Sequence, residues 1–323
     1  MRILRNADIA ALAGVADLVK VIADTMRAVS AREAQMPLRF VVPLAGGDRF
    51  GVMAGAVPGI GHGAKLLTLR HSHGGKSGSS HRGAMILLDA ESGTPAAVMD
   101  SGLLTALRTA AASAVATAAL AREDASHLAI LGYGEQAQRH IEAICAIRPI
   151  TRLSVWGRSA EKAAAFAARF PGARAMATIE EAVAEADIVC AVTTAREPIL
   201  DASMLPEGVH VNAVGASTPD VQEIAADLYR DCKAYVDYRP SAEGQAADLI
   251  AARKSGFVTG EVPEIGEVLS GRAVGSTGAR ERTLYRSLGL IAQDLAAASF
   301  FLRRAEQADK GIFVDLYGEG VKS

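Results

Sequence analysis

Apolar residues fall three and four positions apart near the start of the chain. This spacing, between residues 7 and 31, predicts an amphipathic helix. The segment after it holds short β-type runs separated by turn residues, with no helical pattern between them. Strands are predicted at residues 39–43, 50–54, 63–69, 84–89 and 96–100. Strands that follow one another this closely favour antiparallel pairing, so the pattern predicts an α+β domain with an antiparallel sheet.

From residue 101 onward, helical and strand patterns alternate. A long alanine-rich helix is predicted over residues 101–122. Strands are then predicted near residues 128–131, 152–156, 187–192, 209–214 and 234–237, separated by helices near residues 135–147, 160–170, 179–184 and 221–230. Alternating elements of this kind predict an α/β fold with a Rossmann-type parallel sheet covered by helices.

The last part of the chain returns to helical patterns. Helices are predicted at residues 242–254, 264–269 and 284–305, and the last of them is expected to lead back to the first domain. A chain of 323 residues is long for a single core, so two domains are predicted. Residues 1–118 with 297–323 would form the α+β domain, and residues 119–296 the dinucleotide-binding Rossmann domain.

The composition narrows the classes of function. The 34 basic side chains are matched by 36 acidic ones, so no basic excess supports binding to nucleic acid. The three cysteines show no Cys-x-x-Cys spacing, which argues against a disulfide framework. The first residues lack the apolar stretch of a signal peptide, and no uninterrupted apolar run reaches the length of about 18 residues expected of a membrane span. We therefore expect a cytoplasmic protein without a nucleic-acid or membrane partner.

A phosphate-binding turn is predicted in the middle of the chain. Gly132, Gly134, Glu135, Gln136 and Ala137 belong to a Gly-x-Gly-x-x-Ala run that follows an apolar strand and opens a helix. Two glycines let the backbone approach a pyrophosphate, and the helix start offers unpaired N–H groups. A second strand and helix follow at the spacing of one βαβ unit. These residues are predicted to bind a dinucleotide, although a purely structural glycine turn would look similar.

Two further groups of residues bear on the cofactor. Arg158 and Ser159 follow the second strand, where an NAD-selective fold often places Asp or Glu. An arginine beside a hydroxyl can hold a 2′-phosphate, so NADP(H) is favoured and NAD(H) is the alternative. Ligands bind beyond the carboxyl ends of parallel strands, which places two predicted strand ends in the cofactor cleft. The residues at those ends are Thr193, Val214, Gly215 and Ala216.

Three cations stand in apolar surroundings. Lys65 lies inside a predicted strand, where burying an ammonium group is unfavourable unless it has a partner or a task. A buried lysine can donate protons near neutral pH, whereas an outward-facing lysine would need no explanation. Arg39, at the start of a strand, and Arg108, on the small-residue face of a helix, leave the same choice. Each of these arginines could pair with a surface acid, or it could bind the carboxylate of a ligand through two parallel hydrogen bonds.

A polar segment from His71 to Gly83 joins two predicted strands and is rich in glycine, serine and cations. With His62 it gathers four of the seven histidines, which raises the question of a metal site. The segment contains no aspartate, glutamate or cysteine, so no metal site is predicted. An anion-binding lid and a solvated loop remain the two interpretations.

Several short sequence blocks also resemble those of a known protein family. They are Gly63-Ala64-Lys65, Ser80-His81-Arg82-Gly83, Leu104-Thr105-Ala106-Leu107-Arg108-Thr109-Ala110-Ala111, Gly132-Tyr133-Gly134-Glu135-Gln136-Ala137, Val211-Asn212-Ala213-Val214-Gly215-Ala216 and Thr283-Leu284-Tyr285-Arg286-Ser287-Leu288-Gly289. Their order and sequence resemble the ornithine cyclodeaminase and μ-crystallin family. The resemblance implies a nicotinamide cofactor that acts on an amino acid or cyclic imine. It also implies a dimerising substrate domain, a nucleotide domain, and an active site between them.

The same blocks imply roles for individual residues. Lys65, Arg39 and Arg108 match family positions that act on the substrate, and Ser80 with His81 matches the Ser/Thr-His pair of the reductase and dehydrogenase branch. Thr109 and Ser287 are predicted, from their blocks, to bind the cofactor.

One departure separates the branches of the family. Cyclodeaminases have Gly-Gly-Asp after the Asn-Ala-Val stretch, with a catalytic aspartate, whereas this chain has Gly215-Ala216-Ser217. Arg82 also departs from the glutamine usual after the Ser/Thr-His pair, and so leaves the substrate open.

The sequence therefore predicts an NAD(P)H-dependent imine reductase. Its substrate would carry a C=N bond next to a carboxylate, as in the reduction of Δ1-pyrroline-2-carboxylate to L-proline. Lys65 would supply a proton, Arg39 and Arg108 would hold the carboxylate, and Ser80 and His81 would complete the polar wall. A small imino or amino acid and a second copy of the chain are the expected partners. The alternatives are an amino-acid dehydrogenase or linear imino-acid reductase, a cyclodeaminase, and a non-enzymatic NADPH-binding protein.

Overall fold

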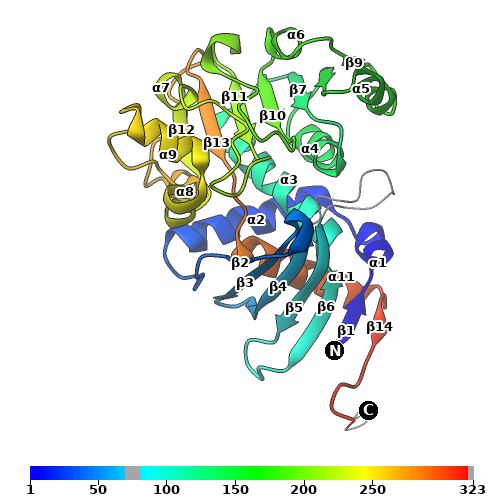
Figure 1. Ribbon diagram of the computed structural model, residues 1–323. Helices are drawn as coiled ribbons and strands as arrows, with labels where there is room; N and C mark the ends of the chain where they lie inside the picture. The colour runs from blue at the N-terminus through cyan, green and yellow to red at the C-terminus, as the bar shows by residue number, and fades with distance from the viewer. Residues whose placement is uncertain (70–80, 319–323) are drawn as a thin grey trace. The chain divides into compact units, whose positions relative to one another are not determined.

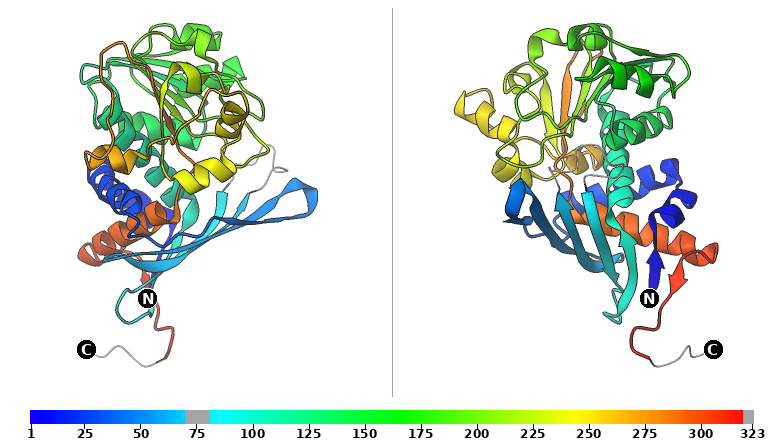
Figure 2. Two further views of the ribbon diagram at one scale, coloured as in Figure 1. Left: turned by 90° about the vertical axis from the view of Figure 1, so that its left-hand side faces the viewer. Right: turned by 45° about the vertical axis from the view of Figure 1, so that its right-hand side comes forward.

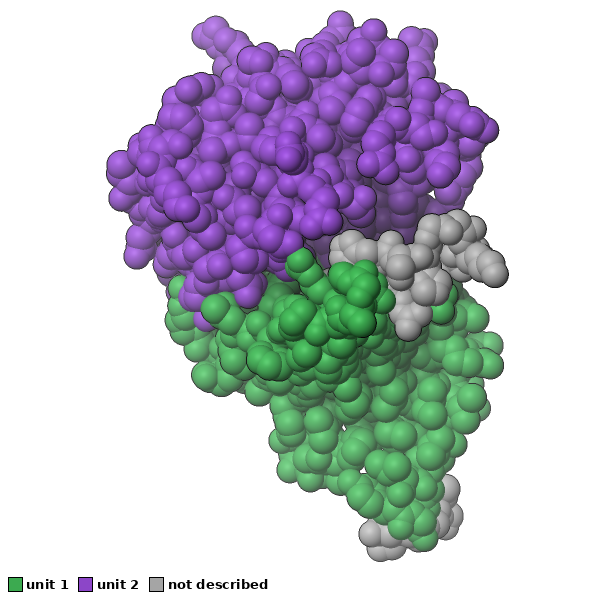
Figure 3. All heavy atoms as spheres, viewed as in Figure 1, with its two compact units in different colours: residues 1–108, 290–323 green, residues 109–289 purple. Residues whose placement is uncertain are grey.

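Two sheets, each of seven strands within the described residues, organise the chain (Figure 1). The computed structural model describes residues 1–69 and 81–318. The first sheet belongs to a unit formed by residues 1–108 and 290–323, and the second to a unit formed by residues 109–289 (Figure 3). The predicted boundaries were 118/119 and 296/297; the units divide at 108/109, which also lies inside the helix Ser101–Leu120 (α3), and at 289/290, just before the helix Ile291–Gln307 (α11).

The first unit contains the predicted antiparallel sheet. Its strand order is β14-β1-β6-β5-β4-β3-β2, and all neighbours are antiparallel except β1 and β6. The strands are β1 (Arg2–Leu4), β2 (Phe40–Pro43), β3 (Arg49–Val57), β4 (Gly61–Leu69), β5 (His81–Leu88), β6 (Pro95–Asp100) and β14 (Ile312–Phe313). The terminal strands β1 and β14 were not predicted, because each is too short to show an alternating pattern.

Two long helices complete the first unit. The helix α11 packs against β3, β4 and β5, and α2 (Val15–Ser30) packs against α11 (Figure 2). The predicted helix at residues 7–31 is wrong in one respect, since it is two helices. The first, α1 (Asn6–Ala11), ends before Gly14, which takes a non-helical conformation at the start of α2. The apolar spacing continues across this break and therefore conceals it.

The second unit contains a parallel sheet, which confirms the predicted Rossmann-type fold. Its strand order is β12-β13-β11-β10-β7-β8-β9, and every neighbouring pair is parallel. The strands are β7 (His127–Leu131), β8 (Arg152–Trp156), β9 (Ala173–Ala175), β10 (Ile188–Ala191), β11 (His210–Ala213), β12 (Lys233–Val236) and β13 (Thr283–Arg286). All residues of β7, β10 and β11 are buried, as expected for a sheet covered on both faces.

Helices connect most of these strands. The helices of this unit besides α3 are α4 (Glu135–Cys145), α5 (Ala160–Ala167), α6 (Ile179–Val183), α7 (Leu228–Asp231), α8 (Arg239–Gln245), α9 (Ala247–Lys254) and α10 (Ile265–Leu269). The helix α3 is long and apolar enough to cross a membrane by composition, but 89% of that stretch is buried within the protein. The core of the protein therefore accounts for its apolar character.

The prediction of one helix over residues 284–305 is wrong at its start. Residues 283–286 form the strand β13, which pairs with β11 on one side and β12 on the other. The chain then passes through Gly289 at φ +79°, and the helix α11 begins at Ile291. All residues of β13 and most residues of α11 are buried, so no alternation of buried and exposed positions separates the strand from the helix.

Two other predicted helices are also wrong in part. Within the segment predicted at 221–230, the helix α7 begins only at Leu228, because Glu223 and Ala225 pair through their backbones with Ile199 and Leu200. The helix predicted at 242–254 is divided at Ala246, which has an extended backbone.

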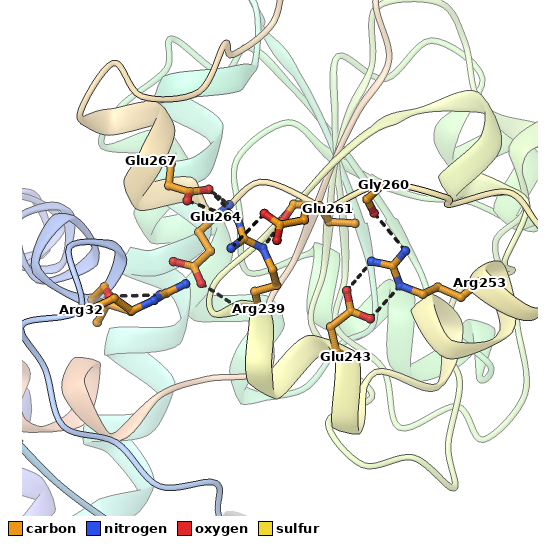
Figure 4. Close-up of polar contacts among 10 residues, drawn as sticks. Arg32, Arg239, Glu243, Arg253, Gly260, Glu261, Glu264 and Glu267 are labelled. Carbon is orange, nitrogen blue, oxygen red and sulfur yellow. Dashed lines mark hydrogen bonds and ion pairs between the residues drawn. The ribbon is translucent and has the colours of Figure 1, made fainter.

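Arginine contacts fix the segment around this break (Figure 4). The guanidinium of Arg253 in α9 bonds to Glu243 of α8 and, at 3.0 Å, to the Gly260 carbonyl oxygen. The guanidinium of Arg239 in α8 lies 3.0 Å from Glu267 of α10. These contacts join α8 to α9 and to α10.

Candidate active site

A buried lysine in the first unit lies beside a buried aspartate. Lys65 stands in the middle of β4, opposite Met53 of β3 and Met85 of β5, and is 1% exposed. Its Nζ atom lies 2.6 Å from Oδ2 of Asp294 and donates to Oγ1 of Thr105 at 3.4 Å. The lysine therefore points into the interior of the unit rather than outward.

Arg108 binds the other oxygen of the same aspartate. Its Nε atom donates to Oδ1 of Asp294 at 2.7 Å, and its Nη1 atom donates to Oε1 of Gln293 at 3.0 Å. Asp294 lies in the first turn of α11 and is fully buried, while Arg108 is nearly so. One carboxylate thus pairs with two cations, and we call Lys65, Arg108 and Asp294 the cationic cluster.

Burial and charge set the protonation of this cluster. Burial lowers the pKa of Lys65 to about 8, opposed by the attraction of Asp294 and assisted by the charges of Arg108 and Arg39. Burial alone would raise the pKa of Asp294, but Arg108 and Lys65 hold it below its usual range. The aspartate is therefore ionised at neutral pH, and the lysine can lose or regain a proton near pH 8. Arg39, half-buried just before β2, contributes by its charge.

Sequence reasoning missed Asp294 and Gln293. Both lie in a helix that was predicted, but its period gave them no special place. The available signal was chemical, since a carboxylate and an amide stand beside the apolar and small residues Ile291, Ala292 and Leu295. A charged group in such a stretch is unfavourable unless it is paired.

The other predicted substrate residues are described in part or not at all. Ser80 lies outside the described residues, as does most of the polar segment from His71 to Gly83. His81 is described only as the backbone of the first residue in β5, where it pairs with Leu69 of β4. The polar wall predicted from Ser80 and His81 therefore stays a prediction.

A cavity of about 310 Å³ lies in the second unit at the carboxyl ends of β7, β8 and β10. Four predicted cofactor residues line it: Gly132, Gly134, Arg158 and Thr193. The other lining residues are Tyr133, Trp156, Gly157, Val192, Thr194, Ala195 and Ile199. Among these described residues there is no carboxylate, and Arg158 is the one cation.

Glycines shape this cavity. Gly132 has φ +131°, and a Cβ atom there would lie 3.0 Å from the Val192 carbonyl oxygen. A Cβ atom at Gly157 would lie 2.2 Å from the ring of Tyr133. At Gly134, the residue before α4, a Cβ atom would meet nothing within 4 Å, so the start of that helix is open. An open helix start next to a tight glycine turn fits the pyrophosphate of a dinucleotide.

The remaining predicted cofactor residues do not line this cavity. Glu135, Gln136 and Ala137 form the first turn of α4, and Ala137 is fully buried in the core. The Ser159 hydroxyl accepts a hydrogen bond from Lys162 N at 3.3 Å, which caps α5. Of the others, Gly215 after β11 is exposed, and the rest lie at buried or half-buried positions in α3 and after β11 and β13; they are Thr109, Val214, Ala216 and Ser287.

Known proteins are similar to this chain in sequence and in fold. Ketimine reductase mu-crystallin of Mus musculus is 37% identical over 265 residues, which cover 81% of this chain and 82% of that protein. Δ1-Pyrroline-2-carboxylate reductase of Thermococcus litoralis, solved in complex with NADH and L-proline, is 27% identical with a TM-score of 0.92 over 97% of this chain and 100% of that one. An archaeal alanine dehydrogenase dimer with bound NAD is 27% identical with a TM-score of 0.90, covering 98% of this chain and 99% of that one.

The fold, the two sites and these relatives define an oxidoreductase that acts on C=N bonds with a nicotinamide cofactor. The sequence profile of the ornithine cyclodeaminase/mu-crystallin family matches residues 1–309, so the chain belongs to that family. The resemblance inferred from the short sequence blocks is thereby confirmed.

Proposed function

We propose that the protein uses NADPH to reduce a cyclic imine that carries a carboxylate, with Δ1-pyrroline-2-carboxylate converted to L-proline. The observation that carries this proposal is the buried cationic cluster, in which Lys65 has a pKa of about 8. Reduction of a C=N bond adds a hydride to carbon and a proton to nitrogen. A lysine that titrates near neutral pH can supply that proton.

The residues of the first unit have separate roles in this reaction. The carboxylate of the imine binds Arg39 and Arg108, which fixes the position of the imine carbon. Arg108 keeps its Nη2 atom for this purpose, since within residues 1–69 and 81–318 only its Nε and Nη1 atoms are engaged. Lys65 donates its proton to the imine nitrogen and regains one from solvent. Asp294 holds the ammonium in place.

The bound nicotinamide supplies the hydride, and the second unit supplies its binding site. Gly132 and Gly134, before α4, would hold the pyrophosphate, and Arg158 would bind the 2′-phosphate of NADPH. Support for NADPH over NADH comes from the position of Arg158 and from the lack of a carboxylate among the described residues that line the cavity.

A homodimer is also part of the proposal. The strand β2 lies at the edge of the first sheet, and its Phe40 is 66% exposed. Leu38, Val41 and Leu44 are exposed beside it. An apolar edge strand of this kind is typical of an interface. Light scattering after size-exclusion chromatography should give twice the mass of the chain, and a monomer at micromolar concentration would contradict this part.

An amino-acid dehydrogenase is the second candidate, because the archaeal alanine dehydrogenase has a similar structure. NADPH or NADH absorbance should be followed with Δ1-pyrroline-2-carboxylate, with its six-membered homologue, and with pyruvate or oxaloacetate plus ammonia. We expect the cyclic imines to be preferred by at least about tenfold in kcat/KM. Preference for a keto acid with ammonia would favour the dehydrogenase. Release of ammonia from ornithine would instead support the cyclodeaminase alternative. Tight NADPH binding without turnover of any compound would favour a binding protein.

A further inference from the structure

Glu223 is a buried carboxylate at the carboxyl ends of two neighbouring strands in the second unit. It is 1% exposed and lies in the extended segment between β11 and α7. Its Oε1 atom accepts a hydrogen bond from the backbone N of Thr193 at 2.5 Å, and its Oε2 atom accepts one from the backbone N of Gly215 at 2.7 Å. One side chain therefore joins Thr193, two residues after β10, to Gly215, two residues after β11.

The backbone of Glu223 holds a second part of the same wall. Its carbonyl oxygen accepts a hydrogen bond from Ile199 N at 2.9 Å, and the next residue, Ile224, pairs in parallel with Leu200. Ile199 and Thr193 both line the cofactor cavity. The side chain and the main chain of Glu223 thus fix two separate segments of that lining.

The carboxylate and Gly215 are matched in shape. A Cβ atom at Gly215 would lie 2.2 Å from the Thr193 carbonyl oxygen and 2.5 Å from each carboxylate oxygen of Glu223. Since real Cβ atoms do not approach other atoms so closely, the arrangement requires glycine at 215. The close packing leaves the carboxylate little freedom to move.

Burial raises the pKa of Glu223, but hydrogen bonds from Thr193 and Gly215 and the charge of Arg286 favour its ionised form. The guanidinium of Arg286 lies 2.9 Å from the carboxylate of Asp248, so Asp248 is its ion-pair partner rather than Glu223. Burying a carboxylate costs free energy, and here the two backbone donors offset part of that cost.

The strand order assigns this geometry to one half of the cofactor. Arg158, at the end of β8, lies on the side where the 2′-phosphate of the adenosine half is proposed to bind. The strands β10 and β11 lie on the other side of β7 in the order β12-β13-β11-β10-β7-β8-β9. A dinucleotide extends across the two halves of such a sheet, with its pyrophosphate at the first turn. Thr193 and Gly215 therefore belong to the nicotinamide half.

We propose that Glu223 is a positioning residue, which holds Thr193 and Gly215 in the conformation that receives the nicotinamide half of the cofactor. The inference rests on the proposed dinucleotide site. Replacing Glu223 should weaken binding of the whole dinucleotide, while a ligand that contains only the adenosine half should bind as before.

The experiment is calorimetric titration of the full-length protein with NADPH and with 2′,5′-ADP. Glu223→Gln keeps one acceptor oxygen but turns an amide N–H₂ group toward the second backbone donor. We expect the Kd for NADPH to rise about tenfold or more, as for the loss of one hydrogen bond to a charged group. The Kd for 2′,5′-ADP should change by less than about twofold. Glu207→Gln is the matched control, because Glu207 is exposed in the same unit, and it should change neither value.

Fluorescence gives a second readout for variants that yield little protein. Trp156 is the only tryptophan in the sequence and lines the cofactor cavity, so energy transfer from it reports bound NADPH. Glu223→Asp keeps the charge but is too short to reach both donors, and an intermediate rise in the Kd for NADPH is expected if Glu223→Gln does not fold. Equal losses for NADPH and 2′,5′-ADP, or no loss for either, would overturn the inference. If the wild-type protein binds neither NADPH nor NADH, the proposed function fails as well.

Discussion

Removing the charge of Asp294 should change the pH at which Lys65 can act. Asp294→Asn keeps the shape of the side chain but deletes the negative charge 2.6 Å from the lysine Nζ atom. Because that charge stabilises the ammonium form, its loss must lower the pKa of Lys65. Two unit charges about 4 Å apart interact by about 4 kcal/mol at an effective dielectric constant of about 20, which corresponds to about three pKa units.

The new amide can still accept a hydrogen bond, so we expect a fall of about two units, from the present pKa of about 8 to about 6. At pH 7.5 the protonated fraction of Lys65 would then drop from about three-quarters to about 3%. The rate that depends on this proton should fall about twentyfold at pH 7.5 and recover below about pH 6. This recovery at low pH distinguishes a shifted pKa from a damaged protein.

The assay is the pH profile of kcat/KM for the imine at saturating NADPH. Ionisation of the imine itself is common to all variants, so the difference between profiles reports the protein. Thr105→Val is the matched control, since it removes a neutral partner 3.4 Å from the same Nζ atom without changing a charge. In this control, the pH at which kcat/KM falls on the alkaline side, the alkaline limb of the profile, should move by less than about half a pH unit.

Arg108→Gln provides the opposite perturbation. The charge of Arg108 lowers the pKa of Lys65, so its loss should move the alkaline limb upward even though substrate binding weakens. This variant also covers the case in which Asp294→Asn, by leaving two buried cations unpaired, loses about 3–5 kcal/mol of stability and does not fold. If the alkaline limb of the profile stays at the wild-type pH in both Asp294→Asn and Arg108→Gln, the reasoning about Lys65 is refuted.

The remaining predictions concern Lys65 and Arg158. Lys65→Met should lower kcat by at least about a hundredfold and leave the Kd for NADPH within about twofold, as measured by single-turnover kinetics and titration; an active variant would remove Lys65 from the mechanism. The folded protein lowers the pKa of Lys65 from 10.5 to about 8, so between these values the unfolded chain binds the extra proton and the free energy of unfolding should rise with pH. Urea denaturation at pH 8 and pH 10 should show this increase in the free energy of unfolding in the wild type and not in Lys65→Met. The same change between the two pH values in both proteins would contradict it. Arg158→Gln should weaken NADPH binding by about tenfold with NADH little changed, and equal effects on the two cofactors would exclude a contact with the 2′-phosphate.

The sequence predicted those parts of the fold whose pattern is local. Alternating residues in β3 to β6, and the glycine turn before α4, depend on neighbours along the chain and were predicted within a few residues. The strand β13 was misread because all four of its residues, Thr283 to Arg286, are buried, so it shows no alternation of buried and exposed positions.

The candidate site was predicted less completely, for a different reason. Lys65 was noticed because a cation in an apolar strand is unusual. Its partner Asp294 is 229 positions away in the chain, and no local pattern joins the two. Glu223 was missed because it lies in an extended segment that was predicted as a helix, where a glutamate is ordinary. Asp294 and Glu223 stand out because they are buried and bind residues distant in the sequence, and both properties arise only in the folded chain.

The most direct test of the proposed reaction is a single turnover. The preformed complex of the protein with NADPH should be mixed with Δ1-pyrroline-2-carboxylate, while NADPH absorbance and L-proline are followed together. We predict that one L-proline forms for each NADPH oxidised, and that Lys65→Met binds the same amount of NADPH but oxidises it at least about a hundredfold more slowly. NADPH that stays bound and unoxidised in the wild-type complex, across a panel of cyclic and linear imines, would contradict the account.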